Sequence, residues 1–241
     1  MPQNMRLTPK PPDVRIEEVR RFALEALRAT SSIFYWIDER QEMQDVQHSG
    51  FAGRNFPLYQ GSMKAYDPLN IARLAGSSKR VATLGQDHVL ASPAEFAHYK
   101  TYLEASRIAD VLDFMFWNGD RPFAGLGILK SPEDPPFCSE SLGFAEAMQP
   151  YIEFNLAAHP RLGRQRLTAH LSASFKFTRR EIEVTTLLRA GCTNHDVADE
   201  LGISLGTVKT HVTRIFDKLG VENRASLVSC VTQMEGEAAL S

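Results

Sequence analysis

Hydrophobic residues along the first 160 positions follow two different spacings. Between Arg15 and Thr30 the apolar residues recur every three or four positions, which predicts an amphipathic helix. Residues 31–38 carry β-branched and aromatic side chains after a serine pair and predict a strand, with residues 45–51 as its partner. Two further apolar runs within residues 109–130 flank the turn sequence NGDRP and predict a hairpin.

The other predicted elements of this region are helices. Asp67-Pro68 is expected to begin a short helix, with the aspartate as N-cap and the proline in the first turn. Ser92-Pro93 begins another helix in the same way, and a long amphipathic helix is expected over residues 140–157, ending before Pro160. This order of elements predicts a small antiparallel sheet flanked by helices.

A purely helical pattern begins after residue 175. Thr178 followed by Glu181 predicts a capping box, Gly202 is expected to end the second helix, and Ser204 to cap the third. A fourth, short helix is expected after Asn223. The apolar residues of the third helix fall on one of its faces: Leu205, Val208, Val212, Ile215, Phe216 and Leu219.

The spacing of Ala198 and Gly202 suits two helices that cross closely through a tight turn. The third helix then keeps an exposed face narrow enough to enter a DNA major groove. The alternative is an ordinary helical bundle with a solvated face. The residues of the exposed face are Gly206, Thr207, Lys209, Thr210, Thr213 and Arg214.

Charge is divided unevenly along the 241 residues. The net charge is −2, but residues 1–160 hold 16 Lys and Arg against 20 Asp and Glu, whereas residues 161–232 hold 11 against 7. The carboxy-terminal part is therefore basic, and this asymmetry indicates an anionic partner there.

Several classes of protein are disfavoured by the sequence. No apolar run is long enough to cross a membrane, and residues 1–13 lack the apolar core of a secretory signal. The three cysteines are widely spaced, which predicts a reducing cytoplasmic location. We find no catalytic cluster, no metal-ligand spacing and no phosphate loop, so we expect a protein that is not an enzyme and needs no cofactor.

Residues 177–228 resemble the LuxR/GerE-type helix-turn-helix over almost its whole length. The resemblance implies four helices, with the third in the major groove of double-stranded DNA. The matching positions are Thr178, Arg180, Glu181, Gly191, Asn194, Ala198, Leu201, Ile203, Ser204, Thr207, Val208, Lys209, His211, Ile215, Lys218, Leu219, Val221 and Arg224.

By this resemblance Lys209, Thr210 and Thr213 lie where relatives reach base edges or nearby phosphates, while Arg214 and Asn194 contact the backbone. Ser204 and Thr207 complete the expected DNA-binding set. Lysine can bond the acceptors of guanine, and a threonine methyl can touch the methyl of thymine.

Specific binding by so small a module usually requires a dimer on a two-fold site. We therefore expect a homodimer, and RNA polymerase is a further candidate partner. The fourth helix of the family commonly supplies a dimer contact, so Leu227, Val228 and Val231 are candidates for it. Core packing is the equal alternative for these three residues.

The front part resembles two kinds of sensor domain. Residues 92–152 are similar to the GAF-like front domain of other LuxR-type regulators. The AYDPLN element is similar to the autoinducer-binding domain, in which an aspartate accepts the ligand's amide N–H. A cavity is then expected to use Trp36, Tyr59, Tyr66, Asp67 and Phe116, with core packing as the alternative for the aromatic residues. Asp113, between apolar residues of a strand, is either a solvent-facing side chain or a polar anchor, and we expect it to face solvent.

The sequence thus predicts an α+β fold in which a GAF/PAS-like or autoinducer-type sensor joins an all-α, four-helix DNA-binding domain. The expected boundaries are 15–160 for the sensor and dimerisation domain, 161–174 for a linker and 175–235 for the helix-turn-helix domain. The expected function is transcription regulation governed by a small ligand, of which a quorum-sensing signal like an acyl-homoserine lactone is one candidate. The alternative is an orphan regulator whose front domain binds no ligand and only dimerises or docks a protein.

Overall fold

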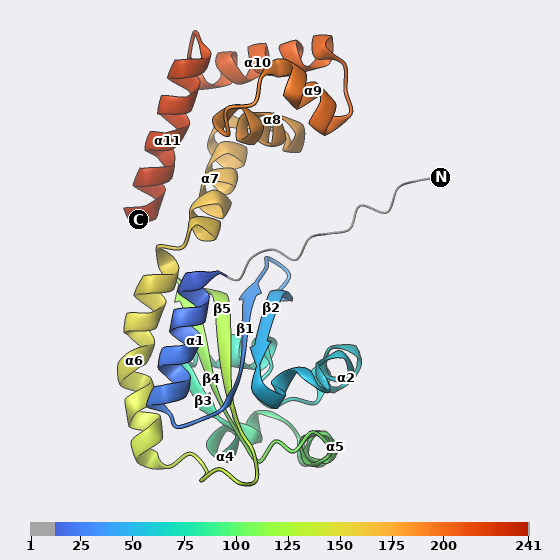
Figure 1. Ribbon diagram of the computed structural model, residues 1–241, viewed down its shortest axis with the longest axis vertical. Coiled ribbons are helices and arrows are strands. Elements are labelled where there is room, and N and C mark those ends of the chain that lie inside the picture. Colours follow the sequence, from blue (N-terminus) through green and yellow to red (C-terminus); the bar gives the residue numbers. More distant parts are fainter. Residues whose placement is uncertain (1–12, 241) are drawn as a thin grey trace. The chain divides into compact units, whose positions relative to one another are not determined.

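A computed structural model describes the backbone of residues 13–240 and the side chains of residues 13–236. Residues 1–12, on which the expectation of no secretory signal rests, lie outside the described part. The chain divides into two compact units, Met1–Leu156 and Ala157–Ser241 (Figure 1). The first is a sheet with helices and the second is entirely helical, so the predicted α+β class is confirmed.

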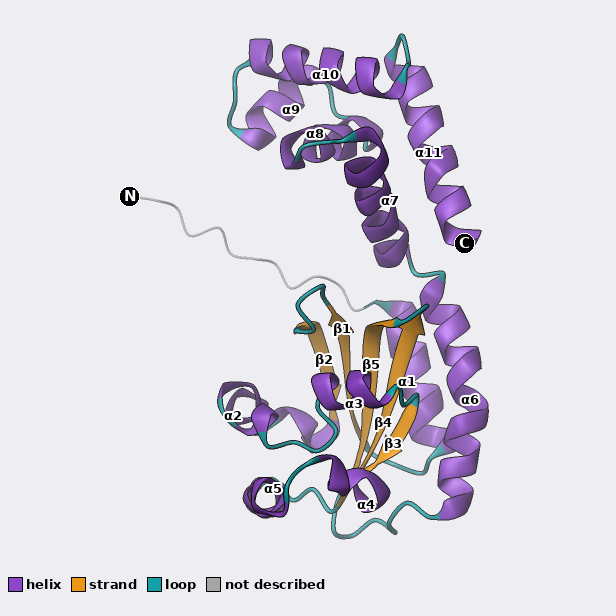
Figure 2. Ribbon diagram, turned by 180° about the vertical axis from the view of Figure 1, so that it is seen from behind, coloured by secondary structure: helices purple, strands orange, loops and turns teal. Residues whose placement is uncertain are grey.

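The amino-terminal unit is built on a five-stranded antiparallel sheet, seen in orange in Figure 2. The strands lie in the order β2-β1-β5-β4-β3. Both predicted strand pairs are present, since β1 pairs with β2 and the hairpin strands β4 and β5 pair with each other. The strands are β1 (Ser31–Ile37), β2 (Met43–Ser49), β3 (Val81–Thr83), β4 (Asp110–Asn118) and β5 (Arg121–Lys130).

Helices cover both faces of this sheet. One face packs against α1 (Val14–Ala26) and α6 (Ser139–Ala157), which lie side by side in Figures 1 and 2. The other face carries the segment between β2 and β4. That segment contains α2 (Phe56–Gly61), α3 (Ile71–Ser77), α4 (Leu84–Asp87) and α5 (Pro93–Ala105), with short 3₁₀ turns at Gly50–Gly53, Met63–Ala65 and His88–Leu90. Alternate residues of each strand therefore enter two separate cores.

Of the two helix starts predicted from capping residues in this unit, one is confirmed and the other is wrong. Ser92 caps α5 with a full capping box that includes Glu95, as predicted. The helix expected at Asp67-Pro68 begins instead at Ile71, because Asn70 accepts the hydrogen bond from the Arg73 N–H and is the N-cap. The prediction of Asp67 as a helix cap is wrong.

The carboxy-terminal unit contains five helices within the described residues. They are α7 (Pro160–Phe175), α8 (Arg179–Arg189), α9 (Asn194–Leu201), α10 (Leu205–Leu219) and α11 (Arg224–Leu240). Thr178 forms the predicted capping box with Glu181, and Gly202 ends α9 at a φ of 62°, in the left-handed region that glycine adopts without strain. The apolar faces of these helices enclose one core, which includes Val184, Val197, Val208 and Ile215.

Two expectations for this unit require correction. The segment 161–174, expected as a linker, lies within α7, and its Leu167 and Leu171 are buried in the helical core beside α11. The apolar spacing that places these leucines on one face is that of a packed helix. The helix after Asn223, expected to be short, continues to Leu240.

Candidate nucleic-acid interface and buried cavity

The third predicted helix, α10, is anchored by its apolar face and capped at its start. Ser204 accepts a hydrogen bond from the Thr207 backbone N–H at 3.1 Å, and the two hydroxyl oxygens lie 2.8 Å apart. Val208 and Ile215 are fully buried against the other helices. The burial of this face turns the opposite side of α10 toward solvent.

That outer face carries the residues expected to contact DNA. Lys209, Thr210, Thr213 and Arg214 are all exposed. The hydroxyls of Thr210 and Thr213 donate to the backbone carbonyls four residues earlier, at 3.0 and 3.1 Å. Their oxygens remain able to accept a hydrogen bond. Within the described residues, neither Lys209 nor Arg214 is engaged in an ion pair, so both cations are available to a phosphate or a base.

Asn194, the remaining predicted backbone contact, is the first residue of α9 and is half-buried. Thr193, immediately before it, caps the helix and forms a capping box with Asp196. The N–H groups of a first helical turn favour an anion at this position.

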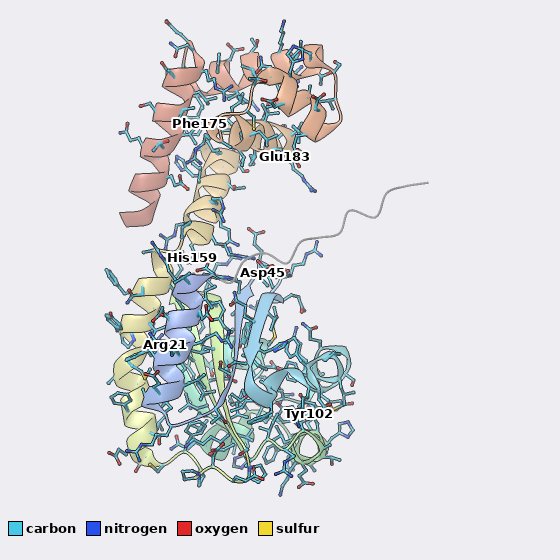
Figure 3. The ribbon with its side chains drawn as sticks, in the orientation of Figure 1. Arg21, Asp45, Tyr102, His159, Phe175 and Glu183 are labelled. Carbon is cyan, nitrogen blue, oxygen red and sulfur yellow. The ribbon has the colours of Figure 1, made fainter. Side chains whose placement is uncertain are left out.

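Other residues of the resemblance hold the helices together. Lys218 on α10 donates to the Glu181 carboxylate of α8 at 2.6 Å. Burial opposes ionisation of Glu181, but the hydrogen bonds from Lys218 and Thr178 outweigh it and hold the pKa of this carboxyl below its ordinary value. Arg224 donates to the Cys192 carbonyl at 2.6 Å, which ties α11 to the start of α9. Glu183, shown on α8 in Figure 3, pairs with Arg180.

The candidate dimer contacts on α11 divide into two kinds. Leu227 and Val231 are fully buried in the core of their own unit. A dimer role for these two residues is therefore wrong, because neither side chain can reach a second chain without leaving that core. Val228 is half-buried and stays a prediction.

A cavity of about 50 Å³ lies in the amino-terminal unit, on the sheet face covered by the segment between β2 and β4. Its walls are apolar residues of the sheet and helices, among them Ile33, Phe56 and Leu129, together with a set of polar groups. Those polar groups are two carboxyls and four phenols: Asp67, Asp113, Tyr35, Tyr59, Tyr99 and Tyr102, the last of them labelled on α5 in Figure 3.

Asp67 is buried and its hydrogen bonds are made within the domain. One carboxylate oxygen accepts from the Leu69 backbone N–H at 2.8 Å, and the other accepts from the Tyr59 hydroxyl at 2.8 Å. The neighbouring Tyr99 hydroxyl also favours its ionised form. Burial raises the pKa of Asp67 to about 6, and these hydrogen bonds with the charge of Arg73 limit the rise.

Asp113, expected to face solvent, lies inside the cavity wall with only 8% of its surface exposed. The expectation was wrong because helices cover both faces of the sheet, so neither side of β4 is free. Among the described residues none hydrogen bonds to its carboxyl. Burial, reinforced by the nearby charge of Asp67, raises the pKa of Asp113 well above its ordinary value.

Two glycines of β5 make room for this arrangement. Asp113 lies opposite Gly127, where an added Cβ would stand 2.7 Å from its Oδ1. Tyr35 lies opposite Gly125, where a Cβ would stand 2.3 Å from the tyrosine Cζ. The absence of side chains at these positions allows both polar groups to lie flat over the sheet.

The predicted ligand residues are only partly brought together. Tyr59 and Asp67 line the cavity, whereas Tyr66 is half-buried beside it and packs its ring on His98 at 4.4 Å. Trp36 and Phe116 lie on the opposite face of the sheet, where both contact Phe123 at ring distances of 6.3 and 6.4 Å. Their assignment to the cavity is wrong, because the period of two along a strand sends them to the other core.

Sequence reasoning missed four cavity groups: Tyr35, Tyr99, Tyr102 and Asp113. The alternation of β1 and β4 carried a signal for Tyr35 and Asp113, since each lies two positions from other residues of the same face. No local signal marked the two tyrosines of α5, whose contact with the sheet depends on tertiary packing.

Within the part of the chain that is described, no helix combines the length and apolarity needed to span a bilayer. The same residues contain no group of three or more His, Cys, Asp or Glu side chains arranged to hold a metal ion.

Comparisons with known proteins found one matching family and several similar proteins. Residues 176–231 match the family model of bacterial regulatory proteins, luxR family. The monoamine regulon transcriptional regulator of Klebsiella aerogenes is 26% identical over 200 residues, covering 83% of this chain and 82% of that protein. The probable transcriptional regulatory protein SgaR of Hyphomicrobium methylovorum is 35% identical over 106 residues, covering 43% and 44%. Among solved structures, Escherichia coli SdiA is similar with a TM-score of 0.44 and 18% identity, over 94% of this chain and 92% of that one.

Proposed function

Because residues 176–231 form a regulatory domain of the luxR family, we propose that the chain is a transcription regulator that binds double-stranded DNA through α10. The main support for this proposal is the set of cations and hydroxyls on the exposed face of this helix. Lys209 and Arg214 are exposed there without an ion pair among the described residues, beside the hydroxyls of Thr210 and Thr213. Cations and hydroxyls on one exposed helix face suit the phosphates and base edges of a major groove.

The test measures binding to DNA from the protein's own promoter. Lys209→Ala should weaken specific binding by about 1–3 kcal/mol, because the lysine is proposed to reach a base edge. Arg179→Ala is the matched control, since it removes an exposed cation from α8 rather than from α10. Equal losses for the two variants, or no loss for Lys209→Ala with its helical content intact, would contradict the proposed contact.

The amino-terminal unit is proposed to sense a small ligand in its cavity. The support is the concentration of six polar groups in an otherwise apolar cavity, a pattern typical of ligand sites. Ligand binding should raise the melting temperature of the full chain, because it stabilises only the folded state. The volume of about 50 Å³ favours a small compound over a long-chain acyl-homoserine lactone, and Asp67, the expected lactone anchor, is already hydrogen bonded to Tyr59 and Leu69.

A second role for this unit, homodimerisation, is supported by the surface of α6. Tyr151 and Phe154 are 66% and 74% exposed, and Phe144 on the same helix is 47% exposed. Large apolar side chains that cluster on a surface mark interaction sites. We propose that this helix pairs with its copy, which would place two α10 helices on a two-fold DNA site. The same pairing would occur in a regulator whose front domain binds no ligand and only dimerises. A ligand-dependent rise in melting temperature distinguishes a ligand-sensing domain from that alternative.

The proposed function implies a cytoplasmic location, where the chromosome lies. RNA polymerase is a further proposed partner for a regulator bound at a promoter.

A further inference from the structure

One buried group in the cavity has no internal partner. Asp113 exposes 8% of its surface and lines the cavity, yet no described residue hydrogen bonds to its carboxyl. Asp67, the other acid of the same cavity, differs because Leu69 and Tyr59 donate to both of its oxygens. A carboxyl in this position is costly to the folded state unless a molecule in the cavity donates a hydrogen bond to it.

The sheet around Asp113 is shaped to leave its carboxyl accessible from the cavity. Its cross-strand neighbours are Gly127 on β5 and Ala82 on β3, the two smallest residues. The carboxyl leans over Gly127, where a Cβ would stand 2.7 Å from Oδ1. Since no described residue donates to them, both oxygens can accept a hydrogen bond from a molecule that enters the cavity.

We propose that Asp113, assisted by Asp67, binds the ammonium group of a short-chain primary amine in this cavity. The proposal rests on the proposed sensor function and names the chemical class of its ligand. An ammonium group carries three N–H donors and no acceptor, which suits two carboxyls that offer only acceptors when ionised.

The rest of the lining favours a cation. The residues around the cavity include no lysine, arginine or histidine that would bind an anionic ligand. Tyr35, Tyr59, Tyr99 and Tyr102 supply aromatic rings, whose faces attract an ammonium ion. The volume of about 50 Å³ limits the organic part to a short chain. A metal ion is a poorer match, because no three ligating side chains are grouped in the described residues.

The test compares three probes with one carbon frame: butylammonium, 1-butanol and butanoate. Each is titrated into the full chain at up to millimolar concentration, with intrinsic fluorescence as the readout. Trp36 and Trp117, the two tryptophans of the chain, both belong to the amino-terminal unit. Wild type should bind butylammonium more tightly than either of the other compounds.

Three variants test whether the Asp113 carboxyl binds the ammonium group. Asp113→Asn keeps the shape and removes the charge, so butylammonium should bind at least about 30-fold more weakly, as expected when one partner of a buried charge pair is lost. Gly127→Ala keeps the charge and displaces the carboxyl, so it should also weaken binding. Asp120→Asn, in the exposed turn between β4 and β5, is the matched control and should bind like wild type.

The proposal is overturned if wild type does not bind butylammonium, if it binds 1-butanol equally well, or if Asp113→Asn leaves the affinity for butylammonium unchanged. Binding of the alcohol or the acid at least as tightly as butylammonium would overturn the assignment of an amine ligand and leave a ligand-sensing domain in place. The affinity of the same variants for promoter DNA is measured in parallel without amine. Failure of wild type to bind promoter DNA in that measurement would count against the DNA-binding function, which this inference does not require.

Discussion

The buried carboxyl of Asp67 should make the stability of the amino-terminal unit depend on pH. Asp67 is 5% exposed, and its pKa is raised to about 6 in the folded chain, mainly by burial. In the unfolded chain an aspartate titrates near pH 4. Because the folded state holds the proton more tightly, Asp67 contributes most to stability below about pH 4. That contribution is lost as the pH rises through about 6.

The size of the effect follows from the two pKa values. A difference of about two pKa units corresponds to about 3 kcal/mol between the protonated and ionised forms. Other groups also titrate over this range, so the useful quantity is the free energy of unfolding of wild type minus that of Asp67→Asn. Most of this, about 2–3 kcal/mol, should be lost from the difference between pH 4 and pH 7, because asparagine has no proton to lose.

The assay is urea unfolding followed by tryptophan fluorescence, since both tryptophans lie in this unit. Asp120→Asn is the control, because that aspartate is exposed in a turn and its substitution should give a difference that does not change with pH. A wild-type minus Asp67→Asn difference that stays constant, or that rises with pH, would refute the buried, proton-binding state of Asp67.

Three further predictions concern DNA binding, assembly and the helical unit. Arg214→Ala should reduce the slope of log affinity against log salt by about one, as expected when one phosphate contact is lost; an unchanged slope would exclude that contact. Phe154→Glu on α6 should convert the proposed dimer to a monomer in sedimentation, whereas Leu58→Glu, at another exposed apolar position, should not; retention of the dimer would exclude α6. Thr178→Ala should lower the stability of the helical unit by about 1 kcal/mol through loss of its cap, measured as faster amide exchange in α8; unchanged exchange would count against the capping box.

The sequence predicted most where local chemistry decides the structure. Helix starts at Ser92, Thr178 and Ser204 follow from side chains that satisfy their own first turns, and the structure confirms all three. The strands of the hairpin follow from two apolar runs around a short turn, and they too are confirmed. Capping and turn signals lie within a few residues, so they can be read without knowledge of the tertiary fold.

The predictions were wrong where contacts with residues distant in the sequence determine the position of a side chain. The aspartate at 67 has the local appearance of a helix cap, but Tyr59 binds its carboxylate in the core and Asn70 takes the cap. Asp113 has the appearance of a solvent-facing residue until α5 and its neighbours are known to cover that face of the sheet. Trp36 was assigned to a pocket by residue type, although the alternation of β1 sends it to the opposite core.

The proposed role of α10 is to read DNA sequence within a two-fold assembly. Selection of binding sites from random duplex DNA, with wild type and Lys209→Ala compared at the same salt concentration, measures this role. Wild type should enrich one two-fold symmetric sequence, and Lys209→Ala should lose base preference at symmetric positions of the two half-sites. Failure of wild type to enrich any sequence, or enrichment of the same site with the same preferences by Lys209→Ala, would contradict it.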